Sequence, residues 1–103
     1  MKTTPAQLTA LCQLMTSLLN GAGYNGTVYA STGPKYARLI LQKDNGIESV
    51  GAFLTLATGD IHKPAGWKAP TKQIRGNVNN PDAGASAFYP AGHIYAGMIR
   101  SLR

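Results

Sequence analysis

Apolar residues near the start of the chain recur at the spacing of one helix face. Thr4, Pro5 and Gln7 precede them in the order of a capping box with proline at the first helical position. The stretch 20–23, Asn-Gly-Ala-Gly, supplies a typical helix stop. The sequence therefore predicts an N-terminal amphipathic helix, in which Cys12 is a small core residue rather than a nucleophile. The apolar face consists of Leu8, Leu11, Cys12, Met15, Leu18 and Leu19.

From residue 26 to residue 56 the pattern changes to one typical of strands. A β-prone run contains Val28 and Tyr29, residues 36–43 alternate, and Asp44-Asn45-Gly46 is a strong hairpin sequence. A further strand is expected at about 49–56, before a turn at 58–60. We expect a three-stranded antiparallel meander that lays one face on the N-terminal helix.

The remainder of the chain predicts less regular structure. Residues 61–77 contain Pro64 and Pro70, which favour a stiff loop over a regular helix. Residues 79–84 are rich in turn formers, and the tail 89–103 has apolar positions at helical spacing that predict a short C-terminal helix. The expected fold class is α+β, with residues 1–103 forming a single domain.

Charge, cysteine content and hydrophobic length indicate which partners and which cellular environment to expect. Ten Lys and Arg against four acids give a net charge of +6, which favours anionic partners such as nucleotides, nucleic acid or an acidic protein. Cys12 is the only cysteine, so an intramolecular disulfide is excluded and a reducing cytoplasm is expected. No stretch approaches the length of a membrane span, so we expect no membrane association.

The segment 61–77 carries the candidate binding chemistry, because it combines four cations and the only tryptophan with no carboxylate. The cations would neutralise phosphates, the indole of Trp67 would stack on a base, and Asn77 supplies an amide that both donates and accepts hydrogen bonds. A lone tryptophan in a small domain is also a common core anchor, and lysines are often only a solvated surface. The candidate ligand-binding residues are Lys63, Trp67, Lys68, Lys72, Arg75 and Asn77.

Catalytic chemistry has little support in the sequence. Glu48 is the only glutamate, and no Ser, His and acid form a recognisable local signature. His62 and His93 could be metal ligands, but two histidines without nearby carboxylates or thiols support a metal site only weakly. An ordinary hydrogen-bonded histidine is the alternative for each. No phosphate-binding motif of the Walker or dinucleotide type is present. We therefore predict a non-enzymatic protein without a metal or cofactor.

The run from Thr58 to Lys72, with its Gly-Asp, Lys-Pro and Trp-Lys-Ala-Pro elements, is followed by Arg75-Gly76-Asn77. This run, continued from Gly84 to Tyr95, resembles a pattern found in small proteins of tailed bacteriophages. By analogy of size, charge and phage origin, the resemblance implies a nucleotide-sequestering "sponge" that captures second messengers of bacterial immunity, such as cyclic oligonucleotides or cyclic ADP-ribose isomers. Such a protein would act in the host bacterial cytoplasm.

Three functions remain open at this point. The first is capture of a phosphate-bearing small molecule, by a homo-oligomer that pairs sites across subunits. The second is nucleic-acid binding through residues 61–77, with an affinity that falls steeply with salt. The third is inhibition of an acidic host protein by a basic surface.

Overall fold

The computed structural model describes residues 2–44 and 46–88, and the fold of this part is α+β. Helix α1 (Pro5–Gly21) begins at a capping box, as predicted. The Gln7 backbone N–H donates to Thr4 Oγ1 over 3.1 Å, and the Thr4 N–H donates to Gln7 Oε1 over 2.9 Å. Leu11, Met15 and Leu19 are the buried residues of α1, one helical turn apart.

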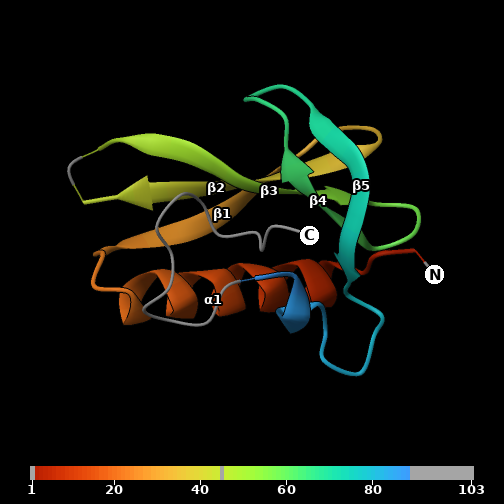
Figure 1. The fold of residues 1–103 in the computed structure, drawn as a ribbon, viewed down its shortest axis with the longest axis horizontal. Coiled ribbons are helices and arrows are strands. Elements are labelled where there is room, and N and C mark those ends of the chain that lie inside the picture. The colour runs from red at the N-terminus through yellow and green to blue at the C-terminus, as the bar shows by residue number, and fades with distance from the viewer. Residues whose placement is uncertain (1, 45, 89–103) are drawn as a thin grey trace.

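Five strands follow α1 and form one antiparallel sheet in sequence order (Figure 1). They are β1 (Gly26–Thr32), β2 (Tyr36–Lys43), β3 (Glu48–Thr55), β4 (Asp60–Pro64) and β5 (Pro70–Asn77). The predicted three-stranded meander is confirmed by β1, β2 and β3, and two further strands extend it.

The core lies between α1 and the face of the sheet that α1 covers. Alternate residues of β2, Ala37, Leu39 and Leu41, join Leu11 and Met15 of α1 in this core. Because side chains alternate across a strand, the remaining residues of β2 point to the opposite face of the sheet. We call this the distal face, and its β2 residues are Tyr36, Arg38, Ile40 and Gln42.

Cys12 is half-buried and packs against the core, in agreement with the prediction of a core residue. Burial raises the pKa of its thiol, which keeps the thiol protonated at neutral pH. Within residues 2–44 and 46–88, no helix has the length and apolar composition needed to span a membrane.

The expectation of a stiff basic loop between residues 61 and 77 is wrong. Residues 60–64 and 70–77 are strands β4 and β5, and only residues 65–69 form the connecting loop. Ile61 is fully buried in the core, so it anchors β4 in the sheet. Pro64 and Pro70 lie where each strand meets the loop, and strand ends tolerate the missing proline N–H.

The chain leaves β5 through turns at residues 78–84, which include the turns predicted at 79–84, and forms a 3-10 helix (Ala85–Ala87). Asp82 fixes this segment, because its carboxylate accepts the N–H groups of Gly84 and Ser86 over 3.0 and 2.9 Å. The C-terminal helix predicted at 89–103, with His93, Arg100 and Arg103, lies outside the described residues.

Candidate anion-binding cleft

A cleft of about 270 Å³ opens at one end of the distal face. The end of β1 and the β1–β2 connection, together residues 31–35, line it with Tyr36 and Arg38 of β2 and Phe53 of β3. Lys68 reaches it from the β4–β5 loop. Three segments separated in sequence thus meet at this cleft, which we call the Arg38 cleft.

The strand register places Arg38 in a row of residues that crosses the sheet. Ser31 of β1 lies opposite Arg38, Arg38 lies opposite Phe53, Phe53 opposite His62, and His62 opposite Ile74. Residues paired in this way share one face of the sheet. The row therefore runs along the distal face beside the cleft.

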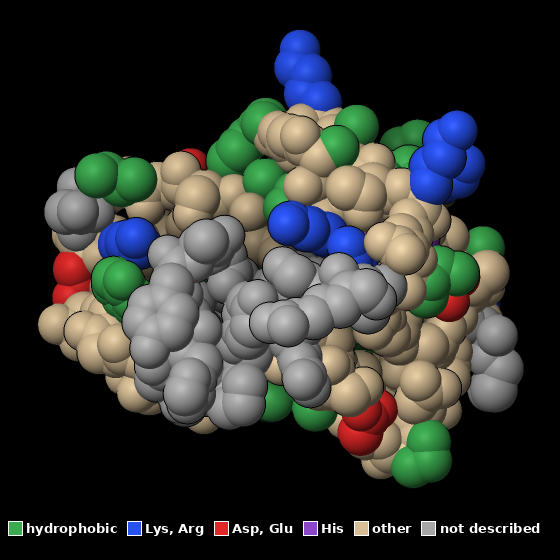
Figure 2. Space-filling view, viewed as in Figure 1, with side chains coloured by type: hydrophobic (Ala, Val, Ile, Leu, Met, Phe, Trp, Pro, Cys, Tyr) green, Lys and Arg blue, Asp and Glu red, His purple; other side chains and the backbone are tan. Residues whose placement is uncertain are grey.

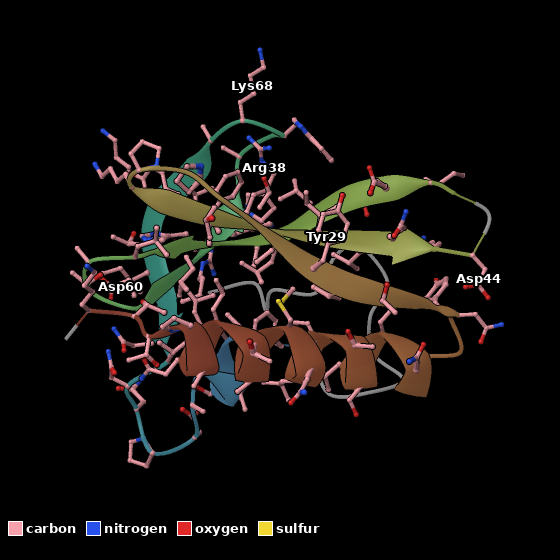
Figure 3. The ribbon with its side chains drawn as sticks, turned by 180° about the vertical axis from the view of Figure 1, so that it is seen from behind. Tyr29, Arg38, Asp44, Asp60 and Lys68 are labelled. Carbon is pink, nitrogen blue, oxygen red and sulfur yellow. The ribbon has the colours of Figure 1, made fainter. Side chains whose placement is uncertain are left out.

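Arg38 lies close to two aromatic rings. Its guanidinium carbon is 5.3 Å from the ring centre of Trp67 and 5.8 Å from that of Phe53. Its Nε is buried and has no hydrogen-bond partner within residues 2–44 and 46–88. Stacking on rings leaves the in-plane N–H groups of a guanidinium available for an acceptor. Figure 3 shows Arg38 on the side of the sheet away from α1, below the loop that carries Lys68.

The charge of the cleft is positive. Lys35 just before β2, Arg38 on β2 and Lys68 in the β4–β5 loop contribute three cations, and the described residues that line the cleft include no Asp or Glu. The Lys35 ammonium lies 5.2 Å from the ring centre of Tyr36, which joins a cation to an aromatic surface there. Figure 2 shows Lys and Arg side chains spread over the part of the molecule that contains β4 and β5.

His62 is buried beneath this region, with 8% of its surface exposed. Its Nε2 lies 2.9 Å from Thr55 Oγ1, and its ring is 6.5 Å from that of Tyr36. The prediction of a hydrogen-bonded histidine is therefore confirmed for His62. Among the residues that the structure describes, no group of three or more His, Cys, Asp or Glu side chains could hold a metal ion.

Two of the six residues predicted to bind ligand lie at the Arg38 cleft. Lys68 lines it, and Trp67 covers Arg38 while 44% of its own surface stays exposed. Lys63 lies on β4 and Lys72 on β5, farther along the same hairpin. Of the six predicted residues, Lys68 is the one that lines the cleft, and Trp67 lies beside it against Arg38.

Arg75 and Asn77 lie toward the other end of β5, and Asn77 is held by internal contacts. The Asn77 side-chain N–H₂ donates to the Thr58 carbonyl over 3.0 Å and to Asp60 Oδ1 over 2.8 Å. Its side-chain oxygen accepts the Asn79 N–H over 2.7 Å. Since strands rise about 3.3 Å per residue, Asn77 and the loop are separated by roughly 23 Å along β5. Figure 3 shows Asp60, the partner of Asn77, far from Lys68.

Sequence reasoning missed Lys35, Tyr36, Arg38 and Phe53, because it concentrated on the cation-rich segment 61–77. One pattern could have identified Arg38. It lies in a strand between Ala37 and Leu39, so it must point away from the core that these two residues enter.

No solved structure and no curated protein matches this chain. One protein family does match it, over residues 5–100, and its description is Family of unknown function (DUF7717). The match covers the helix, all five strands and the Arg38 cleft. The chain therefore belongs to the DUF7717 family.

Proposed function

We propose that this protein binds a phosphate-bearing small molecule of the nucleotide class in the Arg38 cleft and does not convert it chemically. The observation that carries the proposal is the environment of Arg38. Its guanidinium lies close to the rings of Trp67 and Phe53, its Nε is buried, and within the described residues Nε has no hydrogen-bond partner. Because Arg38 lines the cleft and Nε itself is shielded, an anion with several acceptor oxygens would interact with the charge and the terminal N–H groups of the guanidinium.

The composition of the cleft suits both parts of a nucleotide. Lys35, Arg38 and Lys68 supply the positive charge that a phosphate needs, and a guanidinium binds phosphate oxygens in a forked geometry. The exposed face of Trp67 offers a surface on which a base stacks. The volume of about 270 Å³ lies just below the range of small-molecule pockets, about 300 to 1,000 Å³, so the cleft suits a ligand no larger than one nucleotide unit.

The side chains at the cleft support capture rather than catalysis. Its described lining includes hydroxyl groups and amines, from Ser31, Thr32, Lys35, Tyr36 and Lys68, but no Asp, Glu, His or Cys that would activate one of them as a nucleophile or act as a general base. The protein would then act stoichiometrically and without a cofactor. We further propose that the ligand is a nucleotide second messenger of bacterial anti-phage immunity and that the protein is homo-oligomeric in the host cytoplasm. These finer points rest on the sequence resemblance and on the size of the chain.

Nucleic-acid binding is the second candidate, and one observation favours it. Cations continue beyond the cleft along the β4–β5 hairpin, where Lys63 and Lys72 lie on neighbouring strands. A backbone with several phosphates could follow this line of charge. It would release counterions on binding, so its affinity would fall steeply with salt.

The first test is Arg38→Ala, with Lys43→Ala as the matched control. Lys43 is on the same strand, carries the same charge and stacks over Tyr24, 4.8 Å from its ring centre, rather than at the cleft. Titration calorimetry would use cyclic dinucleotides, cyclic ADP-ribose, purine nucleotides and a short single-stranded oligonucleotide, each at low and high salt. We expect Arg38→Ala to weaken nucleotide binding about 10- to 100-fold, as expected for a charged hydrogen bond of about 1.5 to 3 kcal/mol, and Lys43→Ala to leave it unchanged.

Equal loss in the two variants would show that only net charge matters and would argue against a site at Arg38. Binding confined to the oligonucleotide, with a steep dependence on salt, would favour the nucleic-acid alternative. Absence of binding to every probe would contradict both and favour a protein target.

A further inference from the structure

One side of the molecule is built from two elements without charged residues, α1 and β1. Residues 3–34, which include both, contain no Lys, Arg, Asp, Glu or His, although charged residues make up 14% of the chain. The Val28 N–H of β1 donates to Thr16 Oγ1 of α1 over 2.9 Å, so the two elements are joined. Figure 3 shows β1 above α1 on the near side of the sheet. Because the cores of protein interfaces are depleted of charged residues, this side has the composition of an interface.

Strand β1 is an edge of the sheet, and part of its backbone faces outward. Among the described residues, β2 is the strand that pairs with it. In an antiparallel pair, alternate residues bond to the neighbouring strand, and the Gly33 N–H donates to the Tyr36 carbonyl over 2.8 Å. Residues in step with Gly33 therefore face β2, and those in step with Val28 face away from it. Ala30 and Thr32 thus direct their N–H and C=O groups outward.

The edge at β1 lacks the features that keep edge strands from pairing with other chains. Lysine, proline, irregular pairing and a covering segment are the usual protection. The other edge, β5, has all four: it contains Pro70 and Lys72, its pairing with β4 shifts register, and Ala87 packs against Gly76. In contrast, β1 contains no proline or charged residue and pairs with β2 without a shift. An edge of this kind is suited to pairing with another strand.

The part of α1 beside β1 is also open and uncharged. A groove of about 470 Å³ runs between the two elements, and the described residues that line it include no charged side chain. Its exposed lining residues on α1 carry hydroxyl or amide groups, so a second chain can approach without burying a charge. They are Thr9, Gln13, Ser17 and Asn20.

We propose that β1 pairs in antiparallel fashion with β1 of a second copy of this chain, so that the two sheets become continuous and the two α1 helices lie side by side. Pairing about a two-fold axis satisfies the outward N–H and C=O groups of both copies at once. Ser31 and Thr32 of β1 line the Arg38 cleft, so each cleft would border this interface. The inference rests on the homo-oligomer of the proposed function and gives it an interface.

Charge favours a second copy over a different partner. Each copy has a net charge of +6, so two copies repel each other, and the side formed by α1 and β1 lets them meet without bringing Lys and Arg together. An acidic partner would instead be attracted to the cations of the Arg38 cleft and of the β4–β5 hairpin.

The test is the molar mass of the full chain without nucleotide, measured by light scattering over a series of protein concentrations. We expect a dimer whose dissociation constant stays level or falls as salt rises, because salt screens the repulsion between the copies. Gln13→Lys places a like charge on both sides of the interface and should raise the dissociation constant at least about tenfold. The matched control is Gln73→Lys, which adds the same charge at an exposed position of β5 and should leave the constant unchanged.

A second variant tests the strand pairing itself. Ala30→Pro removes an N–H that faces outward and leaves the hydrogen bonds between β1 and β2 in place, and edge strands tolerate proline. It should also raise the dissociation constant at least about tenfold, while circular dichroism and thermal unfolding show that both variants remain folded.

A dimer that survives both Gln13→Lys and Ala30→Pro would overturn the interface and leave the homo-oligomer standing. Equal weakening by Gln13→Lys and Gln73→Lys would show an effect of net charge alone and would also overturn it. A wild-type protein that is monomeric at every concentration would reject the homo-oligomer together with the interface. Nucleotide binding at Arg38 is decided separately, by the calorimetry of the proposed function.

Discussion

At the scale of the residue, the Arg38–Trp67 pair explains how a half-exposed tryptophan is held in one place. The sequence left two roles open for Trp67, a stacking surface or a core anchor. In the structure 44% of Trp67 is exposed, and its ring lies 5.3 Å from the guanidinium carbon of Arg38. The core cluster of the described residues does not include Trp67. The role of a core anchor therefore has no support in its packing.

We expect Trp67→Ala to reduce the free energy of unfolding by about 1 kcal/mol, which is typical of an exposed cation–π contact. Removal of a buried tryptophan would cost about 3 to 5 kcal/mol. Urea unfolding of the variant would measure the difference, with Met15→Ala as the buried reference, expected to lose about 2 to 5 kcal/mol. A loss in Trp67→Ala as large as that in Met15→Ala would mean that Trp67 is a core residue.

At the scale of the element, the β4–β5 hairpin is joined to the rest of the sheet by the pairing of β4 with β3 and by the β3–β4 turn. Asn77 and Asn79 both donate to the Thr58 carbonyl, over 3.0 and 3.2 Å. Gly59 in this turn has a φ of 82°, a left-handed conformation that favours glycine. A Cβ at Gly59 would lie 2.8 Å from Val78 Cγ2 and 2.8 Å from Asn79 Nδ2. The turn thus sets where the hairpin, and with it Trp67 and Lys68, is placed.

Gly59→Ala should therefore destabilise the protein by about 1 to 3 kcal/mol, the usual cost of a strained backbone conformation. Gly66→Ala is the matched control, because a Cβ there would meet no heavy atom within 4 Å. Thermal or urea unfolding would compare the two variants. Equal stability of Gly59→Ala and wild type would show that the turn tolerates a side chain and does not constrain the hairpin.

At the scale of the whole molecule, ten Lys and Arg face only four acids, so each carboxylate accounts for a large share of the change in stability at acidic pH. Asp82 accepts hydrogen bonds from the side chain of Ser86 and from the backbone of Gly84 and Ser86, and these bonds lower its pKa. The folded protein then binds the Asp82 proton less tightly than the unfolded chain does. The resulting stabilisation is present above the unfolded pKa, about 3.9, and is lost as the pH falls through the lower folded value.

We expect the stability of the wild-type protein to decrease as the pH falls below about 4, and Asp82→Asn to show a shallower decrease. Ser86→Ala should give part of the same effect, because the Ser86 side chain is the largest cause of the lowered pKa. Urea unfolding at a series of pH values between neutral and strongly acidic would measure these slopes. An unchanged slope in Asp82→Asn would contradict a lowered pKa at this residue.

Local patterns were enough to predict much of the fold. The capping box at Thr4, the alternation of residues 36–43 and the hairpin at 44–46 concern neighbours in sequence, and the structure confirms the helix, the strands and the connection between β2 and β3. The sequence analysis did not predict the β4–β5 hairpin, because its prolines and lysines are locally typical of a loop. The burial of Ile61 between sheet and helix, a long-range contact, decides in favour of strands.

The sequence by itself determined the α+β class, the amphipathic helix, the meander and the excess of positive charge, because each follows from residue types and from spacing along the chain. Tertiary structure alone decided which cations meet. Strand pairing brings Arg38 of β2 beside Phe53 of β3, and the β4–β5 loop places Trp67 over Arg38, 29 residues away in sequence. It also separates Asn77 from the loop, because an extended strand carries its two ends far apart.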